Sequence, residues 1–405
     1  MRKVITMVGT SIFDNYREEN TSDTLFKRYI EDLKDKGESE YGEEIRRIRD
    51  IKNKIAKWIN EKKLEDKVDI SAEVKSLIKL KEELKEELEI YLLCSDTLLS
   101  IVAGEIIEEF IEDNEEMFNT QADRVKKEII KDLQVSNREK FEDGMNRLVN
   151  KMYEISNDFW ENVVVNVTGG FKATIPFLTI LSQVNKCPVY YIFEKTDVLI
   201  KIPNIPINVN WNVFEEHEKL FLDIEKEGIK KLSEGLKDIA DIKAIVEYTG
   251  DLISFNPLGL TLWKKYKERF ELFYISPIVK EFIERKENKL VVDNSLMELK
   301  RRLLNNPDHP DLDHKLHGID LKGFKCFKHK ERNLQVRIIY TTERWETSYG
   351  SEELNIYIGD IAIGSEVHNA ESEYIKQFAN NLSKIENLSS YEIYRIDKIV
   401  PKEEY

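Results

Sequence analysis

Two short glycine-containing segments have the residue types that bind anions. Residues 9–11 read G-T-S and follow an apolar run, and residues 168–172 read T-G-G-F-K and follow the run V-V-V-N-V. Glycine lets the backbone approach an anion closely, the start of a helix offers unpaired N–H groups, and a lysine adds a point charge. A Gly-Gly turn that opens a helix can equally reflect tight packing. The pattern leaves both interpretations open.

A basic segment near the end of the chain is the second group of interest. Between His314 and Arg337 there are seven Lys or Arg residues against only Asp320 and Glu331. The whole chain has 62 Lys plus Arg against 77 Asp plus Glu, and its net charge of −15 opposes general attraction to nucleic acid. The segment is therefore either a local strip of phosphate contacts or the solvent face of a hairpin.

Five of the six histidines also lie at or after residue 309. An imidazole titrates near neutrality and suits proton transfer. His309, His314 and His317 lack a nearby cysteine and a regular ligand spacing, so no zinc or other metal site is predicted. The three cysteines lie far apart along the chain, which fits reduced, buried thiols and a cytoplasmic location.

Strand-like and helix-like patterns alternate over the first half of the chain. Apolar, β-branched runs predict strands at 3–8, 89–97, 125–135, 163–167, 189–194 and 197–202. Helical periodicity separates most of them, and charge-laced amphipathic helices fill residues 22–88. This alternation favours an α/β fold with a mostly parallel sheet covered by helices on both faces.

Changes in composition suggest three domains. A proline-marked stretch closes the first domain near residue 210, and the helical insertion at about 22–88 belongs to it. Residues 211–289 are predicted to be a helical linker, and residues 290–405 a small α+β domain. We find no signal-peptide pattern and no apolar run of membrane-spanning length, so neither secretion nor a membrane span is expected.

Six sequence blocks support a family resemblance for the first domain. They are V-G-T-S, S-A-E-V-K-S-L, Y-L-L-C-S-D-T, K-D-L-Q, N-V-T-G-G-F-K-A-T-I-P and Y-Y-I-F-E-K-T-D. In this order they resemble the CRISPR-associated Rossmann fold (CARF) sensor domains of type III CRISPR ancillary nucleases, over roughly residues 1–210.

The resemblance implies an allosteric activator, a cyclic oligoadenylate, with cyclic tetra-adenylate as the expected ring. It also implies a homodimer whose two-fold axis passes through the ring, so that each loop is presented twice. The hydroxyls of Thr10, Ser11 and Thr168 could in addition position a ribose 2′-OH for slow cleavage of the ligand. The implied ligand-binding residues are Gly9, Thr10, Ser11, Asn166, Thr168, Gly169, Gly170 and Lys172.

The tail resembles a second family. A helix, the segments L-H-G-I-D-L-K-G-F-K-C-F-K-H-K, L-Q-V-R-I-I-Y and L-N-I-Y-I-G-D-I-A-I-G, and a terminal helix follow one another over about residues 290–385. This order is similar to the RelE family of ribosome-dependent mRNA interferases. Lys325 and Arg337 fall on two basic positions of that family. Phe327 stands where a second basic residue is frequent, and the arginine expected after the last Ile-Gly is missing.

RNA cleavage by internal attack needs a group that takes the 2′-OH proton, a cation for the phosphate, and a proton donor for the leaving oxygen. We expect Arg337 and Lys325 to stabilise the phosphate charge, His368 to act as base or acid, and Tyr374 or Lys328 to be a supporting donor. The sequence thus predicts a cyclic-oligoadenylate-activated, metal-independent endoribonuclease of antiviral defence that cuts mRNA on the ribosome.

Three alternatives stay open. Arg302 and His309 have the Arg–His spacing of HEPN ribonucleases, which act on free RNA, although Pro307 breaks the helical pattern between them. Glu298 and Lys300 offer the Glu-x-Lys letters of metal-dependent DNases, but within a helical pattern. A non-enzymatic, ligand-gated regulator would use residues 215–288 as a winged-helix-like module, against which their acidic beginning counts.

Overall fold

The computed structural model describes residues 1–134, 138–157, 159–193, 196–231, 239–285, 289–364 and 371–398. The chain forms two compact units. Unit 1 contains Met1–Tyr266 and Ser348–Ser351, and unit 2 contains Lys267–Thr347 and Glu352–Tyr405. Each unit has sheets of its own and is described separately.

Unit 1 is built on a six-stranded sheet with the order β3-β2-β1-β4-β5-β6. Neighbouring strands are parallel, except that β6 runs antiparallel to β5. All eight residues of β2 are buried, as expected for a mostly apolar strand inside a parallel sheet. The predicted α/β sheet is confirmed. Its strands are β1 (Arg2–Val8), β2 (Leu88–Ser95), β3 (Val125–Ile130), β4 (Val163–Asn166), β5 (Val189–Ile192) and β6 (Leu199–Ile202).

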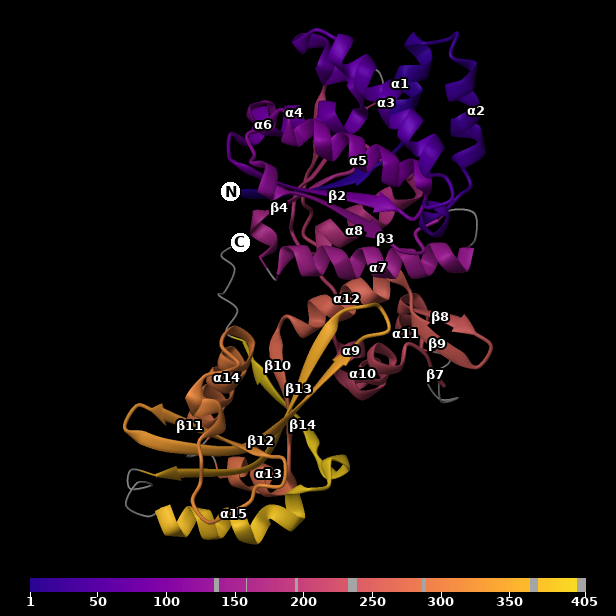
Figure 1. Ribbon diagram of the computed structural model, residues 1–405. Helices are drawn as coiled ribbons and strands as arrows, with labels where there is room; N and C mark the ends of the chain where they lie inside the picture. Colours follow the sequence, from indigo (N-terminus) through magenta and orange to yellow (C-terminus); the bar gives the residue numbers. More distant parts are fainter. Residues whose placement is uncertain are drawn as a thin grey trace. The chain divides into compact units, whose positions relative to one another are not determined.

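Helices cover both faces of this sheet (Figure 1). On one side lie α4 (Ala72–Leu84) and α5 (Leu98–Glu112), and on the other lie α7 (Arg138–Ser156) and α8 (Ile175–Val184). The strand order reverses between β1 and β4, so the carboxyl ends of these two strands border the crevice where ligands of such sheets bind.

The segment between β1 and β2 is helical, as its amphipathic pattern predicts. It contains α1 (Ser11–Glu19), α2 (Thr24–Leu33) and α3 (Ile45–Glu61) before α4, and the short α6 (Glu115–Phe118) follows α5. Phe13, Phe26 and Ile55 from the first three helices share one hydrophobic core with Val4 of β1. Because this core is continuous with the sheet, the inserted helices are part of unit 1's folded body.

Residues 211–289 differ from the helical linker that the sequence predicts. They include a three-stranded sheet with the order β7-β9-β8, and their last strand, β10, pairs in the sheet of unit 2. The β8–β9 hairpin turns at Gly250, whose φ is 64°, a conformation that glycine adopts at no steric cost. The elements are α9 (Asn212–Glu216), α10 (Glu218–Glu227), β7 (Lys230–Lys231), α11 (Ala240–Ile245), β8 (Val246–Thr249), β9 (Leu252–Phe255) and α12 (Pro257–Lys267).

Unit 2 is an α+β unit around a five-stranded sheet with the order β11-β12-β13-β10-β14. The strands β11, β12 and β13 form an antiparallel meander, and β10 is parallel to β13. The elements are β10 (Phe270–Ile275), α13 (Pro277–Glu284), α14 (Lys289–Asn305), β11 (Lys325–Glu331), β12 (Leu334–Glu346), β13 (Glu352–Gly364), α15 (Glu371–Ile385) and β14 (Glu392–Asp397).

Each face of this sheet has a hydrophobic core. On one face Phe327 and Ile338 pack with Leu296 of α14, and on the other Cys326 and Ile339 belong to the cluster that contains Phe378 of α15. Compact unit 2 begins at Lys267, not at residue 290, because β10 and α13 belong to it. The three-domain division itself stays a prediction. Among the described residues, no helix is long and apolar enough to cross a membrane.

Candidate functional site

The two glycine segments of unit 1 meet at the carboxyl edge of the sheet. They follow β1 and β4, which are parallel neighbours with Thr6 opposite Asn166. A Cβ atom on Gly9 would lie 2.7 Å from the backbone nitrogen of Gly170, so this close approach requires a glycine. The two glycine segments therefore lie against each other at this edge of the sheet.

Asn166 holds the second loop from inside the protein. Its side chain is fully buried, and its amide nitrogen donates to Ser76 Oγ at 2.7 Å and to Thr6 Oγ1 at 3.3 Å. Its amide oxygen accepts from the backbone N–H of Thr168 at 3.2 Å and from the Thr168 hydroxyl at 2.7 Å. With these four bonds the Asn166 amide is fully used within the fold.

Sequence reasoning missed one residue of this site, Glu73. Its carboxylate is fully buried at the start of α4 and accepts from the Gly9 N–H at 2.7 Å and from the Ser11 hydroxyl at 3.0 Å. A Cβ atom on Gly169 would lie 2.1 Å from Glu73 Oε1. The available signal was Ser71, the N-cap of α4, whose hydroxyl accepts from the Val74 N–H at 3.1 Å.

Packing explains the glycines of the second loop. Gly170 has a φ of 80°, and a Cβ there would lie 2.7 Å from Met7 Cβ. The close-packed-turn interpretation of T-G-G therefore accounts for both glycines. Of the side chains predicted to bind ligand, Thr10 and Lys172 are exposed and Ser11 and Thr168 are half-buried, so these four are the ones that a ligand in the crevice could reach.

In unit 2 the predicted catalytic residues divide between the two faces of the sheet. Lys328 lies directly opposite Arg337 in the β11–β12 pair, so both belong to the face covered by α15, which also carries the buried Tyr374. Lys325 lies opposite Tyr340, on the face covered by α14. His368 lies outside the described residues.

Arg337 is a buried cation that has no counterion among the described residues. It is 1% exposed, its Nη1 donates to the Val336 carbonyl at 3.0 Å, and its Nε has no hydrogen-bond partner among the described residues. Within that described part of the chain no carboxylate pairs with it. Because a buried, incompletely bonded charge is costly, such a group calls for a specific explanation, and the capacity to bind an anion is one.

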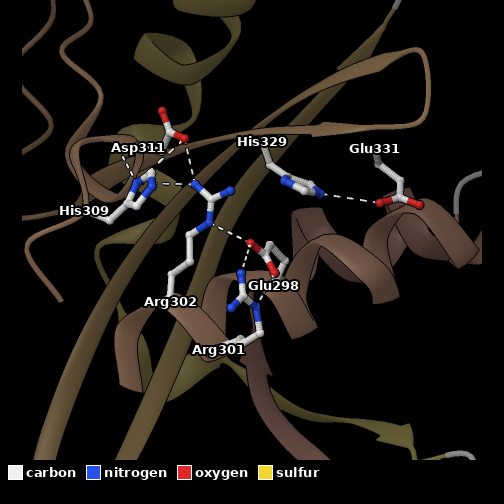
Figure 2. A network of polar contacts seen from close by, with 7 residues as sticks. All are labelled: Glu298, Arg301, Arg302, His309, Asp311, His329 and Glu331. Carbon is white, nitrogen blue, oxygen red and sulfur yellow. Dashed lines mark hydrogen bonds and ion pairs between the residues drawn. The ribbon is translucent and has the colours of Figure 1, made fainter. Parts of the chain in front are cut away.

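Arg302 and His309, the pair with HEPN-like spacing, do come together (Figure 2). The helix α14 ends at Asn305, and the turn after it returns His309 Nδ1 to 3.4 Å from Arg302 Nη1. Arg302 is also bound by Asp311 at 2.6 Å and by Glu298 at 2.7 Å. The His309 Nδ1 accepts from the Asp311 N–H, which leaves Nε2 as the protonated nitrogen of the neutral ring.

Glu298 also binds Arg301, a second arginine of α14, and so adds it to the network. Arg301 binds Glu298 through two hydrogen bonds of 2.7 and 2.8 Å, and these, followed by the single bond from Arg302, lower the pKa of its carboxyl to about 2. The network therefore pairs two arginines with two carboxylates, and its charges are internally balanced.

A pocket of about 530 Å³ lies beside this network, between α14 and β11. Its cationic lining groups are also paired, Lys300 with Glu271 and Arg301 with Glu298, and the His329 ring lies 3.4 Å from Glu331. Because both cations already have a carboxylate partner, the pocket offers no unpaired lysine or arginine among its lining residues to an anionic ligand.

The described residues contain no metal-binding cluster, and the three thiols are not of the reactive kind. Among the described residues, no group of three or more His, Cys, Asp or Glu side chains could hold a metal ion. The three cysteines are free and buried, and burial raises the pKa of Cys94 and Cys326 to about 12 and that of Cys187 to about 11. These thiols stay protonated at neutral pH and suit packing rather than catalysis.

Comparison with known proteins connects one part of unit 1 to a family. Residues 68–205 match the family described as CRISPR-associated protein (Cas_APE2256), a stretch that includes α4 with Glu73, β4 and the loop 168–172. No curated protein matches the chain. This part of unit 1 is thus similar to a CRISPR-associated family.

One similar solved structure is that of Can2 from Sulfobacillus thermosulfidooxidans in complex with cyclic tetra-adenylate. It is 12% identical in sequence and covers 68% of this chain and 67% of its own, with a TM-score of 0.20. A TM-score of this size does not define a common fold.

Proposed function

We propose that the protein is an endoribonuclease of type III CRISPR antiviral defence that a cyclic oligoadenylate activates. The match of residues 68–205 to a CRISPR-associated family supports the defence context, and that stretch contains one of the two loops at the crevice of the sheet. The sequence blocks that resemble CARF domains support the ligand class. The proposed binding form is a homodimer that presents both loops twice to one ring.

On the sensor side, Lys172 and Thr10 are the proposed contacts for the phosphates of the ring, because both side chains are exposed at the loops. The half-buried hydroxyls of Ser11 and Thr168 lie deeper in the same loops. Asn166 has a supporting role in this proposal, since its amide is used entirely by Thr6, Ser76 and Thr168.

One observation carries the nuclease assignment: the buried guanidinium of Arg337 has no counterion within the described chain. A phosphodiester that entered this face would supply the missing negative charge, and the guanidinium would stabilise the further charge of the transition state. Lys328, directly opposite, would add a second cation. RNA can reach Arg337 only when the groups that bury it move. In this proposal, the ring activates the enzyme by favouring the conformation in which they have moved.

The proton transfers are assigned to the remaining members of the predicted set. His368 is the proposed acid or base, and Tyr374 is a proposed donor on the α15 face. Lys325 lies on the opposite face, so its proposed role is contact with the RNA backbone beyond the scissile phosphate. The chemistry is metal-independent transfer of the phosphoryl group to the 2′-oxygen, with protonation of the departing 5′-oxygen.

The proposed substrate is mRNA on the ribosome. The net charge of −15 makes efficient capture of free RNA unfavourable, and a ribosome would present and align the message instead. The order of helix, three strands and helix, which resembles that of the RelE family, supports the same substrate.

The test mixes purified protein with synthetic cyclic oligoadenylates and mRNA, with and without translating ribosomes. We expect cleavage only with both ring and ribosomes. Lys172→Ala should lose ring binding measured by calorimetry, and Arg337→Ala should bind the ring normally but not cut. Ring binding without cleavage under any condition would instead support a non-enzymatic regulator, and unaltered cleavage by Arg337→Ala would refute the catalytic assignment.

A second candidate function is cleavage of free RNA at Arg302 and His309. The 3.4 Å contact between their side chains favours it, and the two carboxylates that occupy Arg302 oppose it. Cleavage without ribosomes that His309→Ala abolishes and Arg337→Ala preserves would select this site.

A further inference from the structure

The buried carboxylate of Glu73 lies where the two loops of unit 1 meet. One oxygen accepts from the Gly9 N–H at 2.7 Å, and the other accepts from the Ser11 hydroxyl at 3.0 Å. The Ser11 oxygen itself accepts from the Ala72 N–H at 2.9 Å, at the first residue of α4. Two donors of the first loop that an anionic ligand could use, the Gly9 N–H and the Ser11 hydroxyl, are therefore already bonded to a carboxylate of the protein.

The negative charge of Glu73 is balanced only weakly. Every hydrogen bond that it receives comes from a neutral group, and no lysine or arginine of the described residues forms an ion pair with it. Lys75, two residues further along α4, is engaged by Asp69 at 2.9 Å and by Asp197. The partial positive charge at the amino-terminal end of α4, where Glu73 is the second residue, compensates part of the negative charge of its carboxylate.

Glu73 is also a spacer between the loops. Its Oε1 lies 3.2 Å from the position of a Cβ on Gly9 and 2.1 Å from that of a Cβ on Gly169, so it touches both loops at once. On the same helix, Ser76 accepts from Asn166 at 2.7 Å. The start of α4 thus fixes the first loop through Glu73 and the second through Ser76.

From these contacts we infer that Glu73 is a positioning and specificity-determining residue of the ligand site. Its carboxylate holds the first loop by accepting from the Gly9 N–H and the Ser11 hydroxyl, and it packs against Gly169 of the second loop. Its charge keeps phosphates at the exposed rim of the site, near Thr10 and Lys172, and disfavours ligands with higher charge. The part of this inference that concerns ligands rests on the proposed function.

The charge effect distinguishes between two kinds of oligoadenylate. A cyclic oligoadenylate has only phosphodiesters, each with one negative charge, whereas a linear oligoadenylate with a 5′-phosphate has a terminal group of charge about −1.5 to −2 at neutral pH. Since repulsion grows with charge, Glu73 should penalise the terminal phosphate more strongly. The residue would thereby favour the cyclic messenger over linear, phosphorylated oligoadenylates.

The experiment uses the full chain with Glu73→Gln and Glu73→Ala, and Glu82→Gln as the matched control. A glutamine keeps the bond from Gly9 through its oxygen and offers its Nε2 to Ser11, so it removes the charge and preserves the shape. Glu82 is exposed on the same helix, where it pairs with Lys79 at 3.4 Å, so its substitution makes the same change in net charge. Calorimetry measures binding of cyclic tetra-adenylate and of 5′-phosphorylated linear tetra-adenylate.

We expect Glu73→Gln to bind the linear ligand about tenfold more tightly than the wild type and the ring less than tenfold more tightly. The ratio of the affinity for the ring to the affinity for the linear ligand should therefore fall. Glu82→Gln should bind both as the wild type does, and Glu73→Ala should weaken binding because the loops lose their common support. Unchanged or weaker binding of both ligands by a folded Glu73→Gln protein would overturn the specificity role.

Amide hydrogen exchange at Gly9 tests the positioning role without any ligand. Exchange of the Gly9 amide should be slow in the wild type and in Glu73→Gln and fast in Glu73→Ala. Each protein is measured at a temperature chosen so that all three have the same free energy of unfolding. Equal exchange in all three proteins would overturn the positioning role. If the wild type bound neither oligoadenylate, the proposed function and the specificity role would fail together, while the exchange data would still decide whether Glu73 holds the loop.

Discussion

At the scale of single residues, Arg337 combines a cost in stability with a proposed role in catalysis. Replacement by methionine removes a buried charge that no carboxylate balances within the described chain. We expect Arg337→Met to raise the free energy of unfolding by roughly 1 kcal/mol, since apolar groups often replace buried charges favourably. RNA cleavage should fall by about 100-fold or more. Urea unfolding and a ring-activated cleavage assay measure the two effects.

The control for this substitution is Arg344→Met on the same strand. Arg344 is exposed and pairs with Glu352 at 2.9 Å, so its loss should change stability by less than about 0.5 kcal/mol. A loss of several kcal/mol in Arg337→Met would contradict the view of Arg337 as an unbalanced cation. A structural role alone would lower stability and activity together, whereas the proposed role moves them in opposite directions.

Single residues also show where sequence reasoning stops. The loops 9–11 and 168–172 could be placed together because they follow strands of one parallel sheet. The role of Asn166 could not be predicted, since an asparagine at a strand end can serve a ligand or its own loop. Glu73 was missed because it reaches Gly9 from 64 positions away, after three intervening helices whose return path no local pattern specifies.

At the scale of elements, Glu298 ties the end of α14 to the turn that follows it. Arg301 and Arg302 lower the pKa of its carboxyl from 4.5 to about 2, so the folded state binds its proton more weakly than the unfolded chain does. The resulting stabilisation is present above pH 4.5 and is lost as the pH falls towards 2. We therefore expect Glu298→Gln to lower the stability of unit 2 at neutral pH.

Urea unfolding at several pH values checks this expectation. The difference in unfolding free energy between the wild type and Glu298→Gln should be constant above pH 5, shrink below pH 4.5 and nearly vanish near pH 2. Glu281→Gln is the control, because Glu281 is exposed and its contact with Arg285 is 3.5 Å long. A difference for Glu298→Gln that does not depend on pH would show that its charge does not stabilise the turn.

Elements also differ in how well the sequence predicts them. Strands β1, β2 and β4 and helix α14 follow from continuous apolar runs or helical periodicity, which are local signals. The helical prediction for residues 211–289 overlooks the short strands β8 and β9, although the Gly250-Asp251 turn between them is a hairpin signal. The strand β10 pairs with β13, more than 80 positions later, and no local pattern encodes such a partner.

At the scale of the whole molecule, the proposed function requires a free-energy coupling between the ring site of unit 1 and the RNA site of unit 2. Thermodynamic linkage makes this coupling reciprocal: if the ring tightens RNA binding by some factor, RNA must tighten ring binding by the same factor. Typical couplings correspond to factors of about 5 to 150. We expect a factor in this range for the full chain with ribosomes programmed by an uncleavable mRNA.

The measurement needs both binding curves. Ring affinity is determined with and without ribosomes that carry an mRNA with 2′-deoxy substitutions, and affinity for those ribosomes is determined with and without the ring. Lys172→Ala should lose the effect of the ring at the concentrations used, because it removes a proposed phosphate contact and leaves the RNA site intact. Equal affinities in all conditions would mean that the two sites bind their ligands independently. The ring would then have to activate a catalytic step that follows RNA binding, because reciprocity constrains binding affinities but not rate constants.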